Sequence, residues 1–184
     1  MGDLGILSEA FRYPAPGIEA RLKAASDQLS SASLRRAFIK FLDSIGRQDL
    51  RAWEELYTRT FDFNPATAPY VGFHVWGDSY RRGAFMVQMS RALRAEGLLW
   101  EGEMPDHASL VMQILDKRPP DGTLSGVSRS SKEEISAEVL REICLTGIRR
   151  MQENLKKAEP DNPYNHLLAA AALAIVQRSA KVNG

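Results

Sequence analysis

Asp106 and His107 are the one adjacent pair of side chains in the sequence that could carry out acid–base chemistry. A carboxylate can orient a neighbouring imidazole, whose ordinary pKa of about 6.5 lies near working pH. A structural role competes with this one. An Asp in the first turn of a helix stabilises the positive end of the helix dipole, and a neighbouring His commonly caps the backbone or packs at the rim of a groove. Adjacent helical residues also point in different directions, so the pattern favours the structural role.

The histidines and the cysteine form no metal-binding pattern in the sequence. None of the three histidines, His74, His107 and His166, has another four residues away, which is the spacing of helical zinc sites. Cys144 is the single cysteine and stands among apolar residues, as a small core residue does. Neither G-x-x-x-x-G-K-[ST] nor G-x-G-x-x-G occurs. The sequence therefore predicts neither a metal nor an organic cofactor.

Aromatic residues, glycines and prolines are concentrated between 53 and 89. Ordering such a stretch costs conformational entropy, so its residues must make compensating contacts. Tyr57 and Phe61 have helical spacing and are expected in the core. Tyr70, Phe73 and Trp76 lie where the helical pattern is broken, and such a segment cannot bury all of its side chains. Because partly exposed Tyr and Trp are frequent in peptide-binding surfaces, this stretch is the predicted working surface.

Most of the remaining chain has hydrophobic residues with the 3.6-residue period of helices. The period occurs at 4–13, 34–45, 49–61, 80–96, 105–115, 130–158 and 162–176, and weakly at 18–29. Asp49 and Asn162 are expected N-caps, Ser130 or Ser131 is expected to begin the long helix, and Pro105 fits a first turn. No segment has the alternation of a strand. The predicted fold is an all-α bundle of about seven helices in one domain, 1–184.

The segment 117–130 has small polar residues and no hydrophobic period. Glycine and serine there bury little that could offset the entropy of ordering the chain. We therefore expect a mobile loop at about 117–130.

Composition and charge limit the partners and the location. The 184 residues are 44% hydrophobic, which is enough to bury a core. Lys and Arg number 24 against 23 Asp and Glu, without a long run of one sign, so nucleic acid and an anionic membrane are not expected partners. The longest apolar run, 167–176, is about half the length of a membrane span, and the first residues lack the features of a secretory signal. We expect a cytoplasmic protein without membrane insertion.

Three groups of residues, each weak alone, form a specific combination. They are Tyr57-x-x-x-Phe61-Asp62, then the block from Tyr70 to Gly83 with Trp76-Gly77-Asp78-Ser79-x-Arg81, and then Glu103-x-Pro105-Asp106-His107. In this order and spacing the chain resembles the NarJ/TorD/DmsD family of redox-enzyme maturation chaperones. Within that family it is most similar to the nitrate reductase delta-subunit (NarJ) branch.

The resemblance implies an all-helical, TorD-like, cytoplasmic protein that is not an enzyme. Members of this family bind the N-terminal peptide of a molybdenum-containing oxidoreductase catalytic subunit and keep that subunit open until its molybdenum cofactor is inserted. The client implied here is the alpha-type catalytic subunit of a respiratory nitrate reductase, and the chaperone itself is expected to be a monomer or a weak homodimer. The peptide-binding residues expected by this resemblance are Tyr57, Phe61, Tyr70, Phe73, Trp76, Asp78, Arg81, Glu103, Pro105, Asp106 and His107.

The chain departs from the NarJ branch in two places, which leaves the client open. Val75 and Trp76 replace part of a Tyr-Arg-Tyr-like stretch, and His107 follows Asp106 as in the wider TorD-like branch. Selenate, chlorate and dimethyl sulfoxide reductases and ethylbenzene dehydrogenase are therefore alternative clients. The competing classes of protein are a small enzyme that uses Asp106 and His107, and a generic helical scaffold.

Two expectations concern geometry. The segments 70–79 and 103–107 should lie together and form one wall of a groove, although other helical segments separate them in sequence. Arg81 is close enough in sequence to Asp78 to hold the loop through an ion pair of small net worth.

Overall fold

The computed structural model describes residues 1–98, 102–118 and 135–180. Within these ranges the chain forms nine α-helices and one π-helix, and its only β-structure is one isolated bridge. The elements are α1 (Asp3–Glu9), α2 (Ile18–Ser26), α3 (Ala32–Ile45), α4 (Leu50–Tyr57), η1 (Thr58–Asp62), α5 (Val71–Trp76), α6 (Tyr80–Ala95), α7 (Ala108–Lys117), α8 (Ala137–Ala158) and α9 (Tyr164–Ala180). The predicted all-α class is confirmed. The helices outnumber the expected seven or so partly because α5 forms where the sequence pattern is broken.

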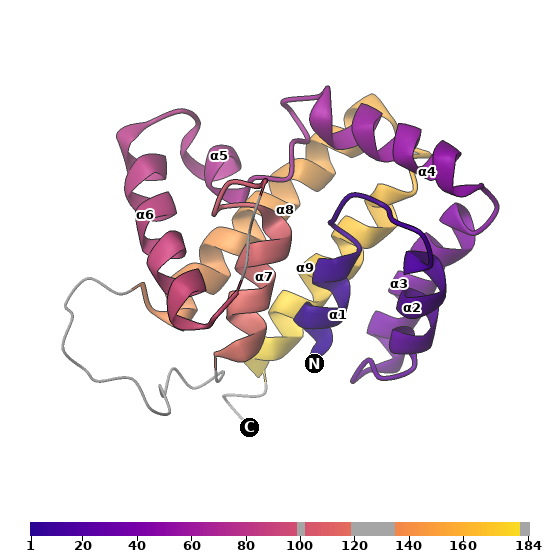
Figure 1. The fold of residues 1–184 in the computed structure, drawn as a ribbon, viewed down its shortest axis with the longest axis horizontal. Coiled ribbons are helices and arrows are strands. Elements are labelled where there is room, and N and C mark those ends of the chain that lie inside the picture. The colour runs from indigo at the N-terminus through magenta and orange to yellow at the C-terminus, as the bar shows by residue number, and fades with distance from the viewer. Residues whose placement is uncertain (99–101, 119–134, 181–184) are drawn as a thin grey trace.

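Helix α9 lies in the middle of the bundle, where it packs against α8, α3 and α1. Figure 1 shows α2, α3 and α4 at one end of the molecule and α5 and α6 at the other. Helix α5 packs against α8, and α6 packs against α5 and α7. The predicted working surface is therefore divided: its part from 71 onward lies at the end formed by α5 and α6, whereas residues 53–62 belong to α4 and η1.

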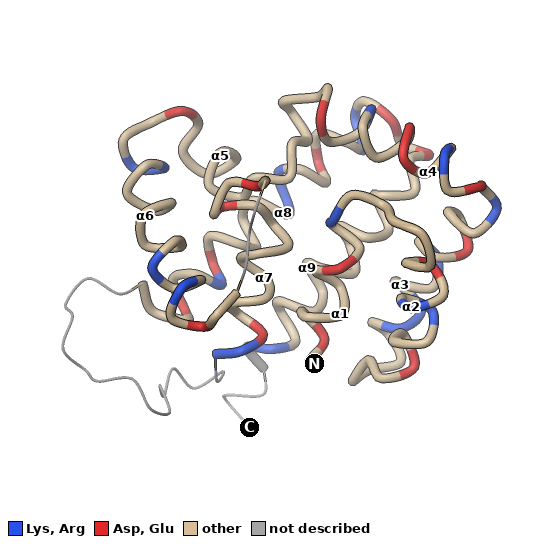
Figure 2. Tube along the Cα trace, in the orientation of Figure 1, with Lys and Arg blue, Asp and Glu red and all other residues tan. Residues whose placement is uncertain are grey.

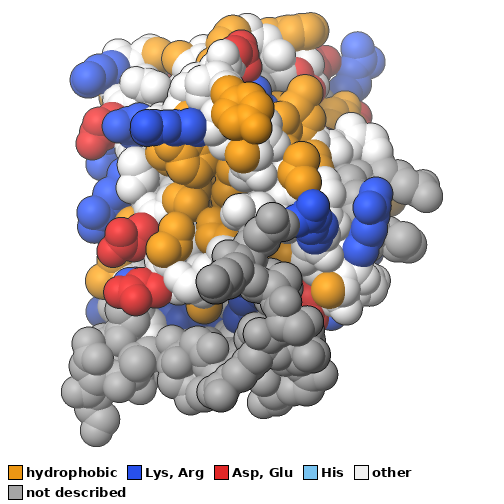
Figure 3. All heavy atoms as spheres, turned by 90° about the vertical axis from the view of Figure 1, so that its left-hand side faces the viewer, with side chains coloured by type: hydrophobic (Ala, Val, Ile, Leu, Met, Phe, Trp, Pro, Cys, Tyr) orange, Lys and Arg blue, Asp and Glu red, His pale blue; other side chains and the backbone are white. Residues whose placement is uncertain are grey.

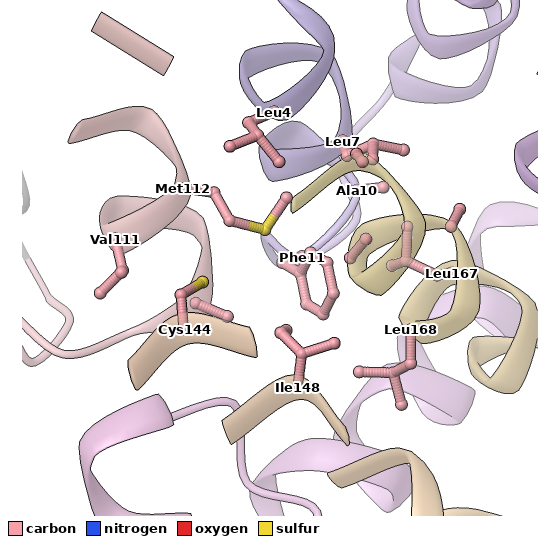
Figure 4. Packing of buried hydrophobic residues seen from close by; sticks show 14 of the residues in the cluster. Leu4, Leu7, Ala10, Phe11, Val111, Met112, Cys144, Ile148, Leu167 and Leu168 are labelled. Atoms are coloured by element: carbon pink, nitrogen blue, oxygen red, sulfur yellow. The ribbon is translucent and has the colours of Figure 1, made fainter. Parts of the chain in front are cut away.

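One continuous cluster of buried apolar side chains joins the helices. Its central part brings together side chains from α1 and the residues just after it, α7, α8 and α9 (Figure 4). The labelled residues are Leu4, Leu7, Ala10, Phe11, Val111, Met112, Cys144, Ile148, Leu167 and Leu168. Cys144 is fully buried, as the sequence predicts, and burial raises the pKa of its thiol to about 12. This cysteine is therefore an uncharged core residue at neutral pH.

The predicted N-caps of α4 and α9 are present. The Asp49 side chain accepts a hydrogen bond from the Ala52 backbone at 2.8 Å, and the Asn162 side chain accepts one from the Tyr164 backbone at 2.9 Å. Both bonds satisfy amide groups that have no partner within the helix.

The predicted beginnings of two other helices are wrong. Helix α8 begins at Ala137, with Ser136 as the N-cap through a bond from the Val139 backbone, whereas Ser130 and Ser131 lie outside the described residues. Helix α7 begins at Ala108, so Pro105 precedes its first turn. This second boundary is determined by backbone hydrogen bonds to the segment that precedes α5. Most of the loop expected at 117–130 also lies outside the described residues.

Candidate functional site

The segments before α5 and α7 are joined through their backbones. Tyr70 and His107 form an antiparallel bridge, in which the Val71 amide donates to the Asp106 carbonyl at 3.0 Å and the Ala108 amide donates to the Pro69 carbonyl at 2.7 Å. Pro105 and Asp106 form a turn closed by a bond from the His107 amide to the Met104 carbonyl, and the bridge then fixes His107 in an extended conformation, so α7 begins only at Ala108. The predicted proximity of 70–79 and 103–107 is therefore confirmed.

The side chains of the same segments are also in contact. The Tyr70 hydroxyl donates to Glu103 Oε2 at 3.0 Å, and the Tyr70 and His107 rings meet edge to face with their centroids 5.6 Å apart. Burial, followed by the charge and hydrogen bond of Glu103, raises the pKa of Tyr70 to about 12. Tyr70 is therefore a neutral donor that holds the exposed Glu103 carboxylate in place.

Arg82 on α6 connects this pair of segments to the start of its own helix. Its Nε donates to Asp106 Oδ2 at 2.8 Å, and its Nη1 donates to Asp78 Oδ1 at 2.9 Å. Its Nη2 lies 3.4 Å from both Asp106 Oδ1 and Met104 Sδ. Burial alone would lower the pKa of Arg82, but its bonds to Asp106 and Asp78 outweigh this effect and raise that pKa. The ion pair with Asp78, which the sequence assigned to Arg81, belongs to Arg82.

Arg82 is absent from the predicted site residues, although its position on the helix could have revealed it. Arg82 shares one face of α6 with the buried Phe85 and Met89, three and seven residues further on. Arg81 is one residue away, about 100° around the helix, and its side chain is exposed. A buried arginine requires a carboxylate partner. The position of Arg82 on the buried face of α6 therefore predicts an ion pair with a carboxylate from another segment of the chain.

Asp106 is fully buried, which changes the role expected of it. A Cβ atom at Gly72 would stand 2.7 Å from Asp106 Oδ2, so α5 lies directly against this carboxylate. Such a group cannot meet a partner's side chain at the rim of a groove without a rearrangement. Asp106 is therefore the buried half of an ion pair with Arg82.

His107 is the N-cap of α7, since its Nδ1 accepts a hydrogen bond from the Ser109 backbone at 3.2 Å. The same atom lies 2.8 Å from Ser109 Oγ. Because Nδ1 acts as an acceptor, the proton of the neutral ring is on Nε2, which is buried without a hydrogen-bond partner. Burial, with a smaller contribution from the charge of Arg12, lowers the pKa of His107 to about 4.

Asp106 and His107 consequently do not form an acid–base pair. The carboxylate bonds to Arg82, while the imidazole bonds to the start of its own helix. Their adjacency in sequence does not bring the two functional groups into the geometry that catalysis requires. Both residues therefore have structural roles, but only His107 has the expected one, as a cap; Asp106 pairs with Arg82 and does not lie in the first turn of α7.

Tyr57 and Phe61 lie in the core, 2% and 1% exposed, and are not part of a binding surface. Both rings pack against Tyr164, with centroid separations of 6.1 Å and 4.6 Å, and the Tyr57 hydroxyl donates to the Phe11 carbonyl. Helical spacing thus identifies them correctly as core residues, whereas the resemblance placed them among the peptide-binding residues.

The remaining predicted residues are accessible to different degrees. Phe73, Trp76 and Pro105 are half-buried, as is Tyr70, whereas Asp78, Arg81 and Glu103 are exposed. Met104, which is not among the predicted site residues, is 48% exposed. The face of the molecule on which α6 lies has a band of hydrophobic side chains with charged groups beside it (Figure 3). Along the described residues, Lys and Arg are interspersed with Asp and Glu (Figure 2).

A hollow of about 470 Å³ lies elsewhere, between α4 and the turn that joins α8 to α9. Leu56 and Ala52 line one side, and Pro160 and Pro163 line the other. Three carboxylates also line it, and an ion pair of 3.7 Å between Arg59 and Glu159 spans from η1 to this turn. None of the predicted site residues is among its lining residues.

The described ranges contain neither a metal-binding cluster nor a membrane-spanning helix. No group of three or more His, Cys, Asp and Glu side chains there could hold a metal ion. No helix there is long and apolar enough to span a membrane.

The fold and the joined segments thus define an all-helical protein whose predicted working surface consists of aromatic rings and exposed carboxylates without a catalytic dyad. No protein-family model matches the chain. It is 24% identical over 173 residues to the probable nitrate reductase molybdenum cofactor assembly chaperone NarJ of Bacillus subtilis (strain 168). The match covers 92% of this chain and 85% of that protein. This likeness supports the resemblance to NarJ-like chaperones, and the prediction of a protein other than an enzyme agrees with a relative that is an assembly chaperone.

Proposed function

We propose that this protein is a system-specific chaperone for a molybdenum-cofactor oxidoreductase, most specifically for a respiratory nitrate reductase. It binds the N-terminal region of the catalytic subunit and assists cofactor insertion and assembly before the enzyme associates with the membrane. The observation that carries the proposal is the similarity to the NarJ assembly chaperone along 92% of the chain. The protein acts in the cytoplasm, as one helical domain that is a monomer or a weak homodimer.

The proposed binding surface consists of Tyr70, Phe73, Trp76, Asp78, Glu103 and Met104, and is called the client surface below. Its apolar members are partly exposed, so a client can bury them further. Its two carboxylates, Asp78 and Glu103, are exposed and are each held by a bond from a neighbouring side chain. This combination suits an amphipathic helix with apolar anchors on one side and a basic residue beside them.

The apolar contacts supply most of the binding free energy and the carboxylates supply orientation. Aromatic side chains give large contact areas at low entropic cost, and they dominate the energetics of many interfaces. Exposed carboxylates contribute less to affinity, but they increase the association rate and select the partner's charge. Affinity for a client peptide should therefore decrease only moderately with salt.

Co-purification tests the identity of the client. The tagged chaperone should retain the nitrate reductase catalytic subunit when the two are produced together, and it should lose that subunit when the subunit's N-terminal segment is deleted. Catalytic subunits of selenate, chlorate and dimethyl sulfoxide reductases and of ethylbenzene dehydrogenase are the comparison set. Retention of one of these in place of nitrate reductase would assign the related client, and retention of none would contradict the chaperone proposal.

A small enzyme is the weaker candidate. The bonds of Asp106 to Arg82 and of His107 to Ser109 occupy the groups that such an enzyme would use. Turnover of a substrate that disappears in both Asp106→Asn and His107→Asn would overturn the chaperone assignment.

A further inference from the structure

Arg82 brings together residues of the client surface that are distant in sequence. Its guanidinium carbon lies 5.7 Å from the centre of the Tyr70 ring and 5.4 Å from that of the Phe73 ring. The same group bonds to the exposed Asp78 and to the buried Asp106. Resting on the proposed function, we propose that Arg82 is the positioning residue of the client surface.

The geometry of the guanidinium explains how one side chain can do this. Its Nε and Nη2 face Asp106, at 2.8 Å and 3.4 Å, while Nη1 faces Asp78 at 2.9 Å. Asp106 is fully buried and is anchored through its backbone to α5, so it fixes the plane of the guanidinium. Because the five donors of an arginine have fixed directions, that plane in turn sets the position of Asp78.

The aromatic half of the surface depends on the same group. A cation near the face of a ring stabilises one orientation of that ring, and Arg82 contacts two rings. One of them, Tyr70, passes this constraint to Glu103 through its hydroxyl. Arg82 therefore orients both exposed carboxylates, one directly and one through Tyr70, although its own side chain is only 10% exposed.

A simple charge effect would act in the opposite direction. Replacing Arg82 by a neutral residue makes the surface more negative, which by itself should strengthen binding of a basic peptide. Loss of positioning should weaken that binding, because the rings and carboxylates must then be ordered when the peptide binds. The sign of the change therefore separates the two effects.

The experiment is calorimetric titration of a synthetic peptide with the N-terminal sequence of the nitrate reductase catalytic subunit. It compares the wild type with Arg82→Gln, Arg82→Lys and Arg81→Gln. The last variant removes the same charge from the adjacent, exposed position and measures the charge effect alone. We expect Arg82→Gln to raise the dissociation constant about tenfold relative to Arg81→Gln. Arg82→Lys should raise it as well, because the lysine ammonium lacks the planar, forked set of donors of a guanidinium.

A double variant controls for the possibility that Arg82→Gln alone unfolds the protein. Arg82→Gln combined with Asp106→Asn removes both members of the buried pair and leaves no lone buried charge. This protein should bind the peptide as weakly as Arg82→Gln does, with an unchanged circular dichroism spectrum. The salt dependence of its affinity should also be smaller than in the wild type, because Asp78 is no longer held towards the client.

Equal affinities of Arg82→Gln and Arg81→Gln, or full affinity in Arg82→Lys, would overturn the inference while the proposed function stands. Failure of the wild type to bind the peptide would instead overturn the proposed function, and the inference with it.

Discussion

Gly147 of α8 lies directly under Val71 of α5, so closely that a Cβ atom at Gly147 would stand 2.7 Å from Val71 Cβ and 2.8 Å from Val71 Cα. This close approach holds α5, and with it the client surface, against α8. The three nearest opposing atoms are Val71 Cβ, Cα and the carbonyl oxygen, which the backbone holds in place, so a side-chain rotation cannot relieve the contact.

Gly147→Ala should therefore destabilise the protein, by about 1–3 kcal/mol, as overpacking of a tight contact does. Gly83→Ala is the matched control, because Gly83 is also helical but a Cβ there would meet nothing within 4 Å. That variant should stabilise by about 0.5–1 kcal/mol through helix propensity. Urea unfolding measures both changes. Equal effects of the two substitutions would contradict the close packing of α5 on α8.

Asp106→Asn should lower the free energy of unfolding by about 3 kcal/mol, because it leaves the guanidinium of Arg82 without its buried partner. Asp78→Asn removes the other carboxylate bonded to Arg82, but that side chain is 83% exposed. Its cost should stay below about 1 kcal/mol. Chemical denaturation of both variants at one pH compares them directly. A larger loss in the Asp78 variant would show that the exposed pair is the stabilising one.

Acidification should destabilise the protein through His107. Its pKa is about 4 in the folded chain against an ordinary value of 6.5, so the unfolded chain binds more protons between these two values. Stability therefore falls as the pH decreases from 6.5 towards 4, by about 3 kcal/mol for this group. Burial also lowers the pKa of His74, which contributes in the same direction.

His107→Asn isolates the first contribution, because asparagine can still act as the N-cap of α7 but does not titrate. Thermal unfolding of both proteins between pH 7 and pH 4 measures the difference. The stability curve of the variant should be flatter over that range. Parallel curves would mean that His107 does not remain neutral in the folded chain.

Trp76→Ala should weaken binding of the client peptide by more than about 1 kcal/mol, as loss of an interface aromatic typically does. Trp76 is half-buried against Phe85, with ring centroids 5.3 Å apart, so part of its ring remains available to a partner. Phe63→Ala is the control, since Phe63 is 81% exposed but lies outside the client surface. Isothermal titration calorimetry on both variants tests the location of the site, and a greater effect at Phe63 would move it to the end of η1.

The sequence by itself determined where most helices lie and which faces they bury. In α3 the apolar period includes Leu34, Ala37, Phe38, Phe41, Leu42 and Ile45, and all of them are buried except Ala37, which is partly buried against the core. Asp49 and Asn162 could likewise be recognised from the sequence as capping residues. Helical period and capping depend on residues within one or two turns of each other, so they can be predicted locally.

Only the tertiary structure decided which charged side chains of the candidate site are buried. Arg81 and Arg82 are adjacent and chemically identical, yet the carboxylate that pairs with Arg82 in the interior is 24 residues further along the chain. Likewise, the bridge between Tyr70 and His107 leaves Pro105 and Asp106 in a turn that precedes α7, and Asp106 becomes a core residue. Such contacts join segments that are distant in sequence, and their free energy depends on burial that exists only after the helices have packed together.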